Sequence, residues 1–301
     1  MKELVIIGSG PAALSAAIYA ARESIDTTVY EQSTFGGQVA TISRIDNYPG
    51  FPDGIDGEEL MERMQSQAEK LGAKLEYGEV TELKPTPSKT VLVTVDGEEV
   101  EARAVLVASG WTYSTMDIPG EAEYKNRGVH YCATCDGPFY KEKKVIVIGG
   151  GNSAAQEAIF LSKFASSVEI LARSTFKADA VLQNKVAKHG IAVHESTQIL
   201  EVLGDSKNVT SLKVEDDDGE HEVTADGVFV FVGIRPSNGF VAGTGIELDA
   251  TGYIKTDGGY QTALPGVFAA GDIRSGSTKQ IVTAAGEGAA AAKVVGKYLA
   301  G

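Results

Sequence analysis

The stretch LVIIGSGPAALSAAIYAA, residues 4–21, decides the fold of this chain of 301 residues. It consists of a short apolar run, a glycine-rich turn and an alanine-rich helical stretch, which together open a βαβ unit. In such a unit Gly8 permits the tight turn, and Gly10 lets the backbone approach a pyrophosphate. The helix N-terminus then offers unpaired N–H groups to the phosphates. The stretch therefore predicts a dinucleotide-binding fold.

A second copy of this pattern, VIVIGGGNSA, occupies residues 145–154 and continues into a helical stretch to about Phe164. The two copies are too far apart to belong to one compact domain, and the chain length also indicates about two domains. We predict an α/β protein with two Rossmann-like, three-layer nucleotide-binding domains.

The irregular stretches at residues 111–120 and 237–245 indicate where the chain passes between these domains. The segment after them holds a strand-like run that ends near Asp272 and a final helix at about residues 279–299. This segment is too short to fold alone, so we expect it to rejoin the first domain. The prediction is a discontinuous first domain, residues 1–115 and 245–301, with a second domain, residues 116–244, inserted into it.

The composition excludes several classes of protein. Hydrophobic residues make up 43% and charged residues 23%, which supports packed cores and excludes disorder. The net charge of −14 would repel a phosphate backbone, so nucleic acid is a poor partner. No apolar run approaches the ~20 residues that span a bilayer, and the N-terminus lacks a signal-peptide layout. We expect a soluble cytoplasmic protein with no nucleic-acid or membrane partner.

The residues that follow each glycine turn differ in charge. Glu31 ends the strand-like residues 27–30, about 20 positions after Gly10, where an acid binds the ribose hydroxyls of FAD or NAD. The corresponding place after the second turn has no acid, and Arg173 and Lys177 stand there instead. A missing acid and present cations favour a 2′-phosphate, hence NADP over NAD.

The chain contains two cysteines, Cys132 and Cys135, in one Cys-x-x-Cys motif. A zinc site needs four ligands, and the chain offers four histidines of which only His130 is near in sequence. We therefore predict no metal site and expect the cysteine pair to be the reactive group.

Five motifs carry a resemblance to a known family: CATCDG at 132–137, GGGNSA at 149–154, GD at 271–272, STFGGQ at 33–38 and DNYPG, with Asp46 and Asn47, at 46–50. With these motifs in this order over about residues 3–299, the chain resembles the low-molecular-weight thioredoxin reductases, which are FAD-dependent pyridine nucleotide-disulfide oxidoreductases. The resemblance implies FAD in the first domain, NADPH as electron donor, thioredoxin or a thioredoxin-like protein as disulfide substrate, and a homodimer.

The resemblance also implies roles for three catalytic residues. Cys135 would face the flavin, and Cys132 would attack the substrate disulfide. Asp136 would supply the proton that the leaving thiolate needs.

Two sets of cofactor-binding residues follow from the same resemblance. FAD would contact Gly8, Ser9, Gly10, Pro11, Ala12, Ala13, Glu31, Gly37, Gln38, Asn47, Val80, Gly110, Gly271, Asp272, Lys279, Gln280 and Ile281. NADP would contact Gly149, Gly151, Asn152, Ser153, Ala154, Arg173 and Lys177. Asp272 would bind the ribityl chain, and the helix that starts near Lys279 would place its N-terminus under the flavin ring.

The electron donor stays open, because the family signature His-Arg-Arg-x-x-x-Arg is only partly present. Residues 171–177 read LARSTFK, so Arg173 and Lys177 remain, and a lysine lacks the bidentate fork of arginine. Residues 177–179 are similar to the reductase component of alkyl hydroperoxide reductases, which favours NADH. NADH and reduced ferredoxin are alternative donors. A flavin-dependent dithiol oxidase and a nucleotide-binding redox sensor without turnover are alternative functions.

Overall fold

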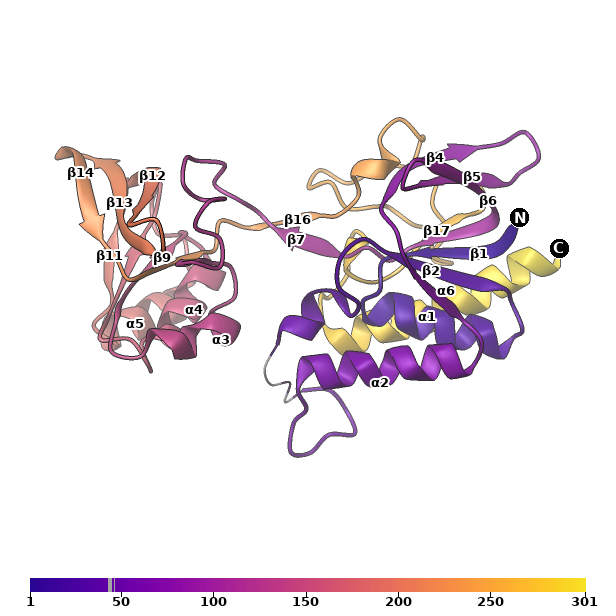
Figure 1. The fold of residues 1–301 in the computed structure, drawn as a ribbon, viewed down its shortest axis with the longest axis horizontal. Helices are drawn as coiled ribbons and strands as arrows, with labels where there is room; N and C mark the ends of the chain where they lie inside the picture. Colours follow the sequence, from indigo (N-terminus) through magenta and orange to yellow (C-terminus); the bar gives the residue numbers. More distant parts are fainter. Residues whose placement is uncertain (43–44, 46) are drawn as a thin grey trace. The chain divides into compact units, whose positions relative to one another are not determined.

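The computed structural model describes residues 1–42, 45 and 47–301, apart from the side chains of Thr134 and Cys135. The chain divides into two compact units (Figure 1). Unit 1 consists of Met1–Thr112 and Arg235–Gly301, and unit 2 consists of Tyr113–Ile234. Unit 2 is therefore an insertion in unit 1, and both units combine helices with a sheet that contains parallel strands. The predicted α/β class with one nucleotide-binding fold inserted into another is confirmed.

The sheet of unit 1 is built from both segments of the chain. Its strands are β1 (Lys2–Ile7), β2 (Thr27–Glu31), β3 (Lys74–Tyr77), β4 (Val80–Pro85), β5 (Val91–Val95), β6 (Glu98–Val107) and β17 (Val267–Ala269). Their order is β3-β2-β1-β6-β5-β4, and β17 pairs with β6. β1, β2, β3, β6 and β17 run parallel, whereas β4, β5 and β6 form an antiparallel meander. Through β17 the C-terminal segment rejoins the first fold.

The helices of unit 1 cover one face of this sheet, and the β4–β5 hairpin lies on the other side (Figure 1). They are α1 (Pro11–Arg22), α2 (Gly57–Lys70) and α6 (Ile281–Ala300). Unit 1 also has three short 3-10 turns, η1 (Gly37–Thr41), η3 (Gly239–Val241) and η4 (Gly271–Ile273), and Val241 and Ile273 pack in the core on the opposite face. Along β1, Leu4 and Ile6 pack toward the helices, while Val5 and Ile7 pack into the opposite core. Both faces are buried, so the strand reads as a continuous apolar run.

Unit 2 has the same layered plan around its own sheet. The parallel strands β8 (Val129–His130), β9 (Lys144–Ile148), β10 (Ser167–Leu171), β11 (Ala192–His194) and β15 (Gly227–Val230) lie in the order β11-β10-β9-β15-β8. One core contains residues of α4 (Asn152–Leu161) and of α5 (Ala180–Lys188). The core on the other face contains residues of the antiparallel strands β12 (Gln198–Gly204) and β13 (Val209–Asp216), which continue into β14 (Gly219–Thr224). The short helix α3 (Ala133–Asp136) and the turn η2 (Gly137–Tyr140) precede β9.

Three expected element boundaries differ from the structure. The final helix begins at Ile281 rather than near Lys279, because Lys279 has a φ of +56° and Gln280 is an extended N-cap. The second helix ends at Leu161 rather than near Phe164, whose N–H bonds to the Leu161 carbonyl in a closing turn. Residues 111–113, expected to be irregular, form β7 (Trp111–Tyr113), which pairs with β16 (Ile234–Pro236).

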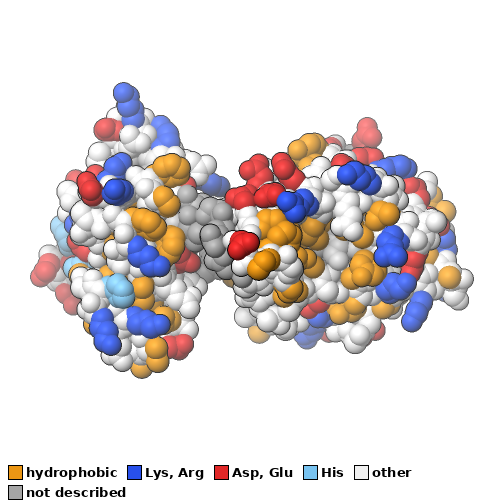
Figure 2. All heavy atoms as spheres, turned by 90° about the horizontal axis from the view of Figure 1, so that it is seen from below, with side chains coloured by type: hydrophobic (Ala, Val, Ile, Leu, Met, Phe, Trp, Pro, Cys, Tyr) orange, Lys and Arg blue, Asp and Glu red, His pale blue; other side chains and the backbone are white. Residues whose placement is uncertain are grey.

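The described surface carries both signs of charge. Figure 2 shows Lys and Arg side chains together with Asp and Glu side chains on the visible face of each unit. In the described part of the chain, none of the helices is both long and apolar enough to cross a membrane.

Candidate active site

A cavity of about 340 Å³ in unit 1 lies where β1, β2 and β6 end and α1 begins, the place where parallel sheets bind nucleotides. Its lining residues are Gly8, Ser9, Gly10, Pro11, Ala12, Glu31, Gln32, Ser33, Gly37, Gln38, Val39, Ile42, Ala108, Ser109, Gly110, Trp111, Thr112, Ser237, Asp272, Lys279, Gln280, Ile281 and Ala284. A second cavity of about 410 Å³ shares five of them, Gly8, Glu31, Gln32, Ser109 and Ser237. The two cavities therefore adjoin through these five residues.

The first glycine turn is shaped for close approach. Gly8 has a φ of +96°, and a Cβ there would lie 2.7 Å from the Ala108 carbonyl oxygen, so no larger residue fits. Gly10 is the N-cap of α1, and Pro11 follows at the first helical position, where a missing N–H costs nothing. The α1 N-terminus therefore faces the cavity with its positive dipole end.

Glu31 presents a fixed carboxylate on the cavity wall. The side chain is buried, and Ser9 Oγ donates to its Oε2 at 2.7 Å. The N–H and hydroxyl of Ser33 donate to its Oε1 at 3.0 and 3.3 Å. An ionised carboxylate can only accept hydrogen bonds, so this group suits a ligand with hydroxyl donors, such as a ribose.

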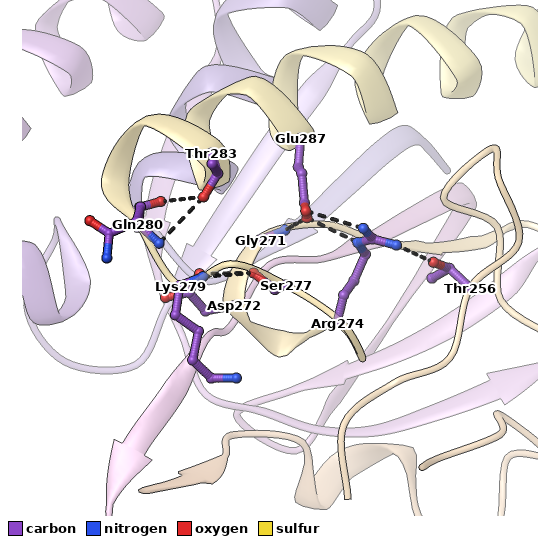
Figure 3. Close-up of polar contacts among 9 residues, drawn as sticks. All are labelled: Thr256, Gly271, Asp272, Arg274, Ser277, Lys279, Gln280, Thr283 and Glu287. Carbon is purple, nitrogen blue, oxygen red and sulfur yellow. Dashed lines mark hydrogen bonds and ion pairs between the residues drawn. The ribbon is translucent and has the colours of Figure 1, made fainter. Parts of the chain in front are cut away.

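Asp272 also lines the cavity, in η4, and its carboxylate accepts from two donors, of which Figure 3 shows Ser277. Trp111 Nε1 donates to Oδ2 at 3.1 Å, and Ser277 Oγ donates to Oδ1 at 3.2 Å. Burial raises the pKa of Asp272 above its ordinary value, and the hydrogen bonds from Trp111 and Ser277 oppose that shift. Lys279 follows, with its ammonium 3.9 Å from the centre of the Tyr253 ring.

An ion pair behind the cavity fixes the position of Asp272 (Figure 3). Glu287 of α6 accepts from Arg274 Nε at 2.9 Å and Nη2 at 3.1 Å, and from the Gly271 N–H at 2.8 Å. Arg274 Nη1 in turn donates to Thr256 Oγ1 at 2.6 Å. The bidentate pair therefore clamps the turn from which Asp272 projects.

The structure brings most of the predicted FAD residues together. Those that line the first cavity are Gly8, Ser9, Gly10, Pro11, Ala12, Glu31, Gly37, Gln38, Gly110, Asp272, Lys279, Gln280 and Ile281. Val80 lines the adjoining cavity, and Asn47 Nδ2 donates to Gln280 Oε1 at 3.2 Å. Ala13 packs in the core on the helix side of the sheet, and the Gly271 N–H is held by Glu287. Asp46 lies outside the described residues.

Several lining residues escaped prediction. Gln32 and Ser33 directly follow Glu31, so their position in the sequence could have indicated them. Trp111 and Ser237 come from the two chain crossings between the units, where the sequence showed only irregular stretches. Glu287, which lies behind the cavity, also escaped prediction, and in the sequence it stands out only as the one acidic residue of the α6 segment.

In unit 2, Cys132 is disulfide-bonded and directly precedes α3, the helix that contains the chain's other cysteine, Cys135. Asp136 ends this helix, and its N–H donates to the Cys132 carbonyl at 3.2 Å. Its Oδ2 lies 3.1 Å from Nδ1 of His130, a buried side chain. One short segment therefore holds all three predicted catalytic residues, with a histidine that the prediction did not include.

The second glycine turn resembles the first in backbone geometry. Gly149 has a φ of +146°, and a Cβ there would lie 2.4 Å from the Phe231 carbonyl oxygen. Gly151 is the N-cap of α4, Ser153 is exposed in its first turn, and Ala154 is buried against the core.

The loop after β10 is tied to this second turn. Lys177 N–H donates to the Gly150 carbonyl at 2.6 Å, while the Asn152 amide exchanges two hydrogen bonds of 2.8 Å with Asp179. The side chains of Arg173 and Lys177 are exposed on this loop. The predicted NADP residues thus lie on the second glycine turn, on the first turn of α4 and on the loop tied to them, and the two cations on that loop are exposed to solvent.

Comparisons with known proteins agree with this geometry. Residues 2–288 match the family model described as pyridine nucleotide-disulphide oxidoreductase. A thioredoxin reductase of Listeria innocua is 39% identical over 99% of this chain and 93% of its own length. A thioredoxin reductase of Treponema pallidum is 40% identical over 99% and 97%. The crystal structure of Lactococcus lactis thioredoxin reductase superposes with a TM-score of 0.84 at 37% identity, covering 100% of this chain and 99% of that one.

Proposed function

The chain belongs to the pyridine nucleotide-disulphide oxidoreductase family, and we propose that it is an FAD-dependent reductase that passes electrons from NAD(P)H to the disulfide of a thioredoxin. The observation that carries the proposal is the presence, in one chain, of a dinucleotide cavity in unit 1 and of a disulfide-bonded Cys132 beside Asp136 in unit 2. The relatives named thioredoxin reductase along nearly the whole chain support the choice of substrate.

The chemistry of the unit 1 cavity fits FAD. The backbone of the turn from Gly8 to Gly10 and the α1 N-terminus would hold the diphosphate, and Glu31 would accept from the adenosine ribose. Asp272, held by Trp111 and Ser277, would contact the middle of the cofactor. When bound, FAD supplies a two-electron carrier that takes hydride from a nicotinamide and reduces a disulfide.

Unit 2 would hold the electron donor. Gly149, Gly151 and the α4 N-terminus offer a second diphosphate cradle, and the loop tied to it carries Arg173 and Lys177. We propose NADPH as the preferred donor, because two cations and no acid stand where the 2′-substituent of the ribose would lie.

The cysteine pair would carry the exchange with the substrate. After reduction, the Cys132 thiolate attacks one sulfur of the substrate disulfide, forms a mixed disulfide and breaks the substrate S–S bond. Asp136 gives its proton to the leaving thiolate. Cys135 then attacks the Cys132 sulfur, which releases the second substrate thiolate and restores the disulfide within the chain.

The test is anaerobic turnover of purified, FAD-loaded protein with oxidised thioredoxin. The proposal expects NADPH-dependent formation of thioredoxin thiols, and no thiols from a Cys132→Ser variant that still binds FAD. Reduction of the flavin by a small dithiol alone, with reoxidation by air, would instead identify a dithiol oxidase. A protein that takes up no flavin would exclude both enzymes.

We further propose that the protein is a cytoplasmic homodimer, as the resemblance to thioredoxin reductases implies. Light scattering of the purified protein and fractionation of its host cell test these two statements independently of the reaction.

A further inference from the structure

His130 is a buried titratable residue that the exchange reaction above does not use. It ends β8, two residues before Cys132, and its side chain is buried. Its ring lies against Phe229 of β15, with centroids 5.2 Å apart, and its Nε2 lies 2.7 Å from the Tyr140 hydroxyl. The imidazole is therefore held by a ring contact on its face and by a hydrogen bond at one nitrogen.

The other ring nitrogen lies beside Asp136, the proposed proton donor. Nδ1 lies 3.1 Å from Asp136 Oδ2, yet it makes no well-aligned hydrogen bond to any part of the chain that the structure describes. A buried polar nitrogen left in this state calls for an explanation. Asp136 supplies one, because its carboxyl is the group proposed to lose a proton during the exchange, and only the ionised form is a pure acceptor.

Tyr140 contacts the Nε2 nitrogen of the His130 ring. Burial and the negative charges of Asp136 and Asp226 raise the pKa of Tyr140 to about 12, so its phenol keeps its proton at neutral pH. The Lys143 ammonium lies 5.4 Å from the centre of the Tyr140 ring. When the phenol donates to Nε2 and the imidazole is neutral, the imidazole proton is on Nδ1, the atom beside Asp136.

We propose that His130 is a positioning residue: anchored by Tyr140, it keeps its Nδ1 3.1 Å from Asp136 Oδ2 and stabilises the carboxylate formed when Asp136 gives its proton to the leaving thiolate. This inference rests on the proposed function, since it needs Asp136 as the proton donor. It assigns to His130 a part in the exchange with thioredoxin and none in the reduction of the flavin.

A double-mutant cycle tests the inference. Holoenzyme is reduced anaerobically and mixed with oxidised thioredoxin in a stopped-flow instrument, while flavin reduction by NAD(P)H is recorded separately. His130→Ala should slow the exchange about tenfold, the worth of one hydrogen bond to a charged group, and leave flavin reduction unchanged. In an Asp136→Asn background the same substitution should cost less than about twofold, because its effect acts through Asp136.

Three further variants sharpen the cycle. His130→Asn keeps an N–H donor at the branch equivalent to Nδ1 and should recover most of the exchange rate. Tyr140→Phe removes only the anchoring hydroxyl and should slow exchange about threefold in the native background and not in Asp136→Asn. It also replaces His130→Ala in the cycle if that variant fails to fold. His194→Ala removes an exposed histidine paired with Glu169 in the same unit and should change nothing.

Each remaining outcome has a distinct meaning. If His130→Ala slows the exchange with thioredoxin equally in the native and the Asp136→Asn backgrounds, His130 has only a structural role and the inference is overturned. If His130→Ala does not slow the exchange at all, the inference is overturned as well. An Asp136→Asn variant that exchanges at the native rate would remove the proposed role of Asp136, and the inference with it. Failure of the native holoenzyme to reduce thioredoxin would instead overturn the proposed function.

Discussion

The two glycine turns of this chain have similar backbone geometry. They differ in the residues that follow the next strand, where the ribose of a nucleotide would lie. Gly8 and Gly149 both have a positive φ and lie against a carbonyl oxygen, and each turn leads into a helix N-terminus. After the first turn, Glu31 is buried and already bonded to two serines. After the second, Arg173 and Lys177 are exposed. The fold thus forms the same glycine turn twice, and we propose that the residues at the end of the next strand decide which nucleotide each turn binds.

The largest effects should come from the turns themselves. Gly8→Ala places a Cβ 2.7 Å from the Ala108 oxygen at a φ of +96°, and we expect FAD affinity to fall about 100-fold, roughly 3 kcal/mol. Gly149→Ala should retain FAD and lose reduction by NAD(P)H. Flavin absorbance of the purified variants and titration of the apoprotein measure both. Gly258→Ala, where a Cβ meets nothing within 4 Å among the described residues, is the control. A Gly8→Ala protein with native FAD affinity would contradict the proposal that the first glycine turn holds the FAD diphosphate.

The ion pair behind the first cavity should rank next. Glu287→Ala leaves the half-buried Arg274 guanidinium and the Gly271 N–H without their acceptor, and we expect a loss of about 2–3 kcal/mol in the unfolding free energy of unit 1. FAD affinity should fall about tenfold, because Asp272 loses its support. Glu59→Ala breaks the exposed pair with Arg63 and should cost under about 0.5 kcal/mol. Denaturant unfolding with and without FAD measures the loss of unfolding free energy in both variants. Equal losses for Glu287→Ala and Glu59→Ala would contradict the proposal that the Arg274–Glu287 pair holds the turn that carries Asp272.

The cations of the second turn should have a moderate, selective effect. Arg173→Ala and Lys177→Ala each remove one charge-assisted contact to a 2′-phosphate, so KM for NADPH should rise about tenfold while KM for NADH stays constant. Lys185→Ala, on the exposed side of α5, serves as the matched loss of charge. Equal increases in KM for NADPH and for NADH would show that these two side chains do not contact the 2′-phosphate.

The smallest effect concerns acid stability. Hydrogen bonds from the Ser275 and Thr251 side chains hold the pKa of Asp249 in unit 1 well below its ordinary value of 3.8. A carboxyl whose pKa is lowered by folding stabilises the fold above its ordinary pKa, and this contribution fades as the pH falls below 3.8. Asp249→Asn should therefore lower Tm at pH 6 and show a flatter decline between pH 4 and pH 2.5. Unit 2 has a counterpart in Asp205, whose pKa is lowered by backbone N–H groups of Asn208 and Lys207, and Asp205→Asn should behave alike.

Contiguous motifs were the predictable part of the molecule. The strand, turn and helix around Gly8 and Gly149, and the acid at Glu31, all depend on spacing within about 25 residues, and the structure places them as expected. The motif alone does not indicate which way Ala13 faces. Its position along α1 places its side chain in the core of unit 1, which helix periodicity would have indicated.

Contacts between distant residues were not predictable. Trp111 and Asp272 are 161 positions apart, and only the pairing of β17 with β6 brings their segments together. The Arg274–Glu287 pair depends on where α6 begins, which the left-handed backbone at Lys279 decides. His130 carries no sequence pattern at all, since its meaning lies in the ring and hydroxyl around it.

The most direct test is anaerobic reduction of the FAD-loaded protein by NADPH, NADH and reduced ferredoxin in parallel, followed by addition of oxidised thioredoxin. We predict that NADPH bleaches the flavin absorbance fastest, and that thioredoxin restores it in the native protein but not in Cys132→Ser. Bleaching by reduced ferredoxin alone, or a flavin that thioredoxin cannot reoxidise, would contradict electron flow from a pyridine nucleotide to Cys132.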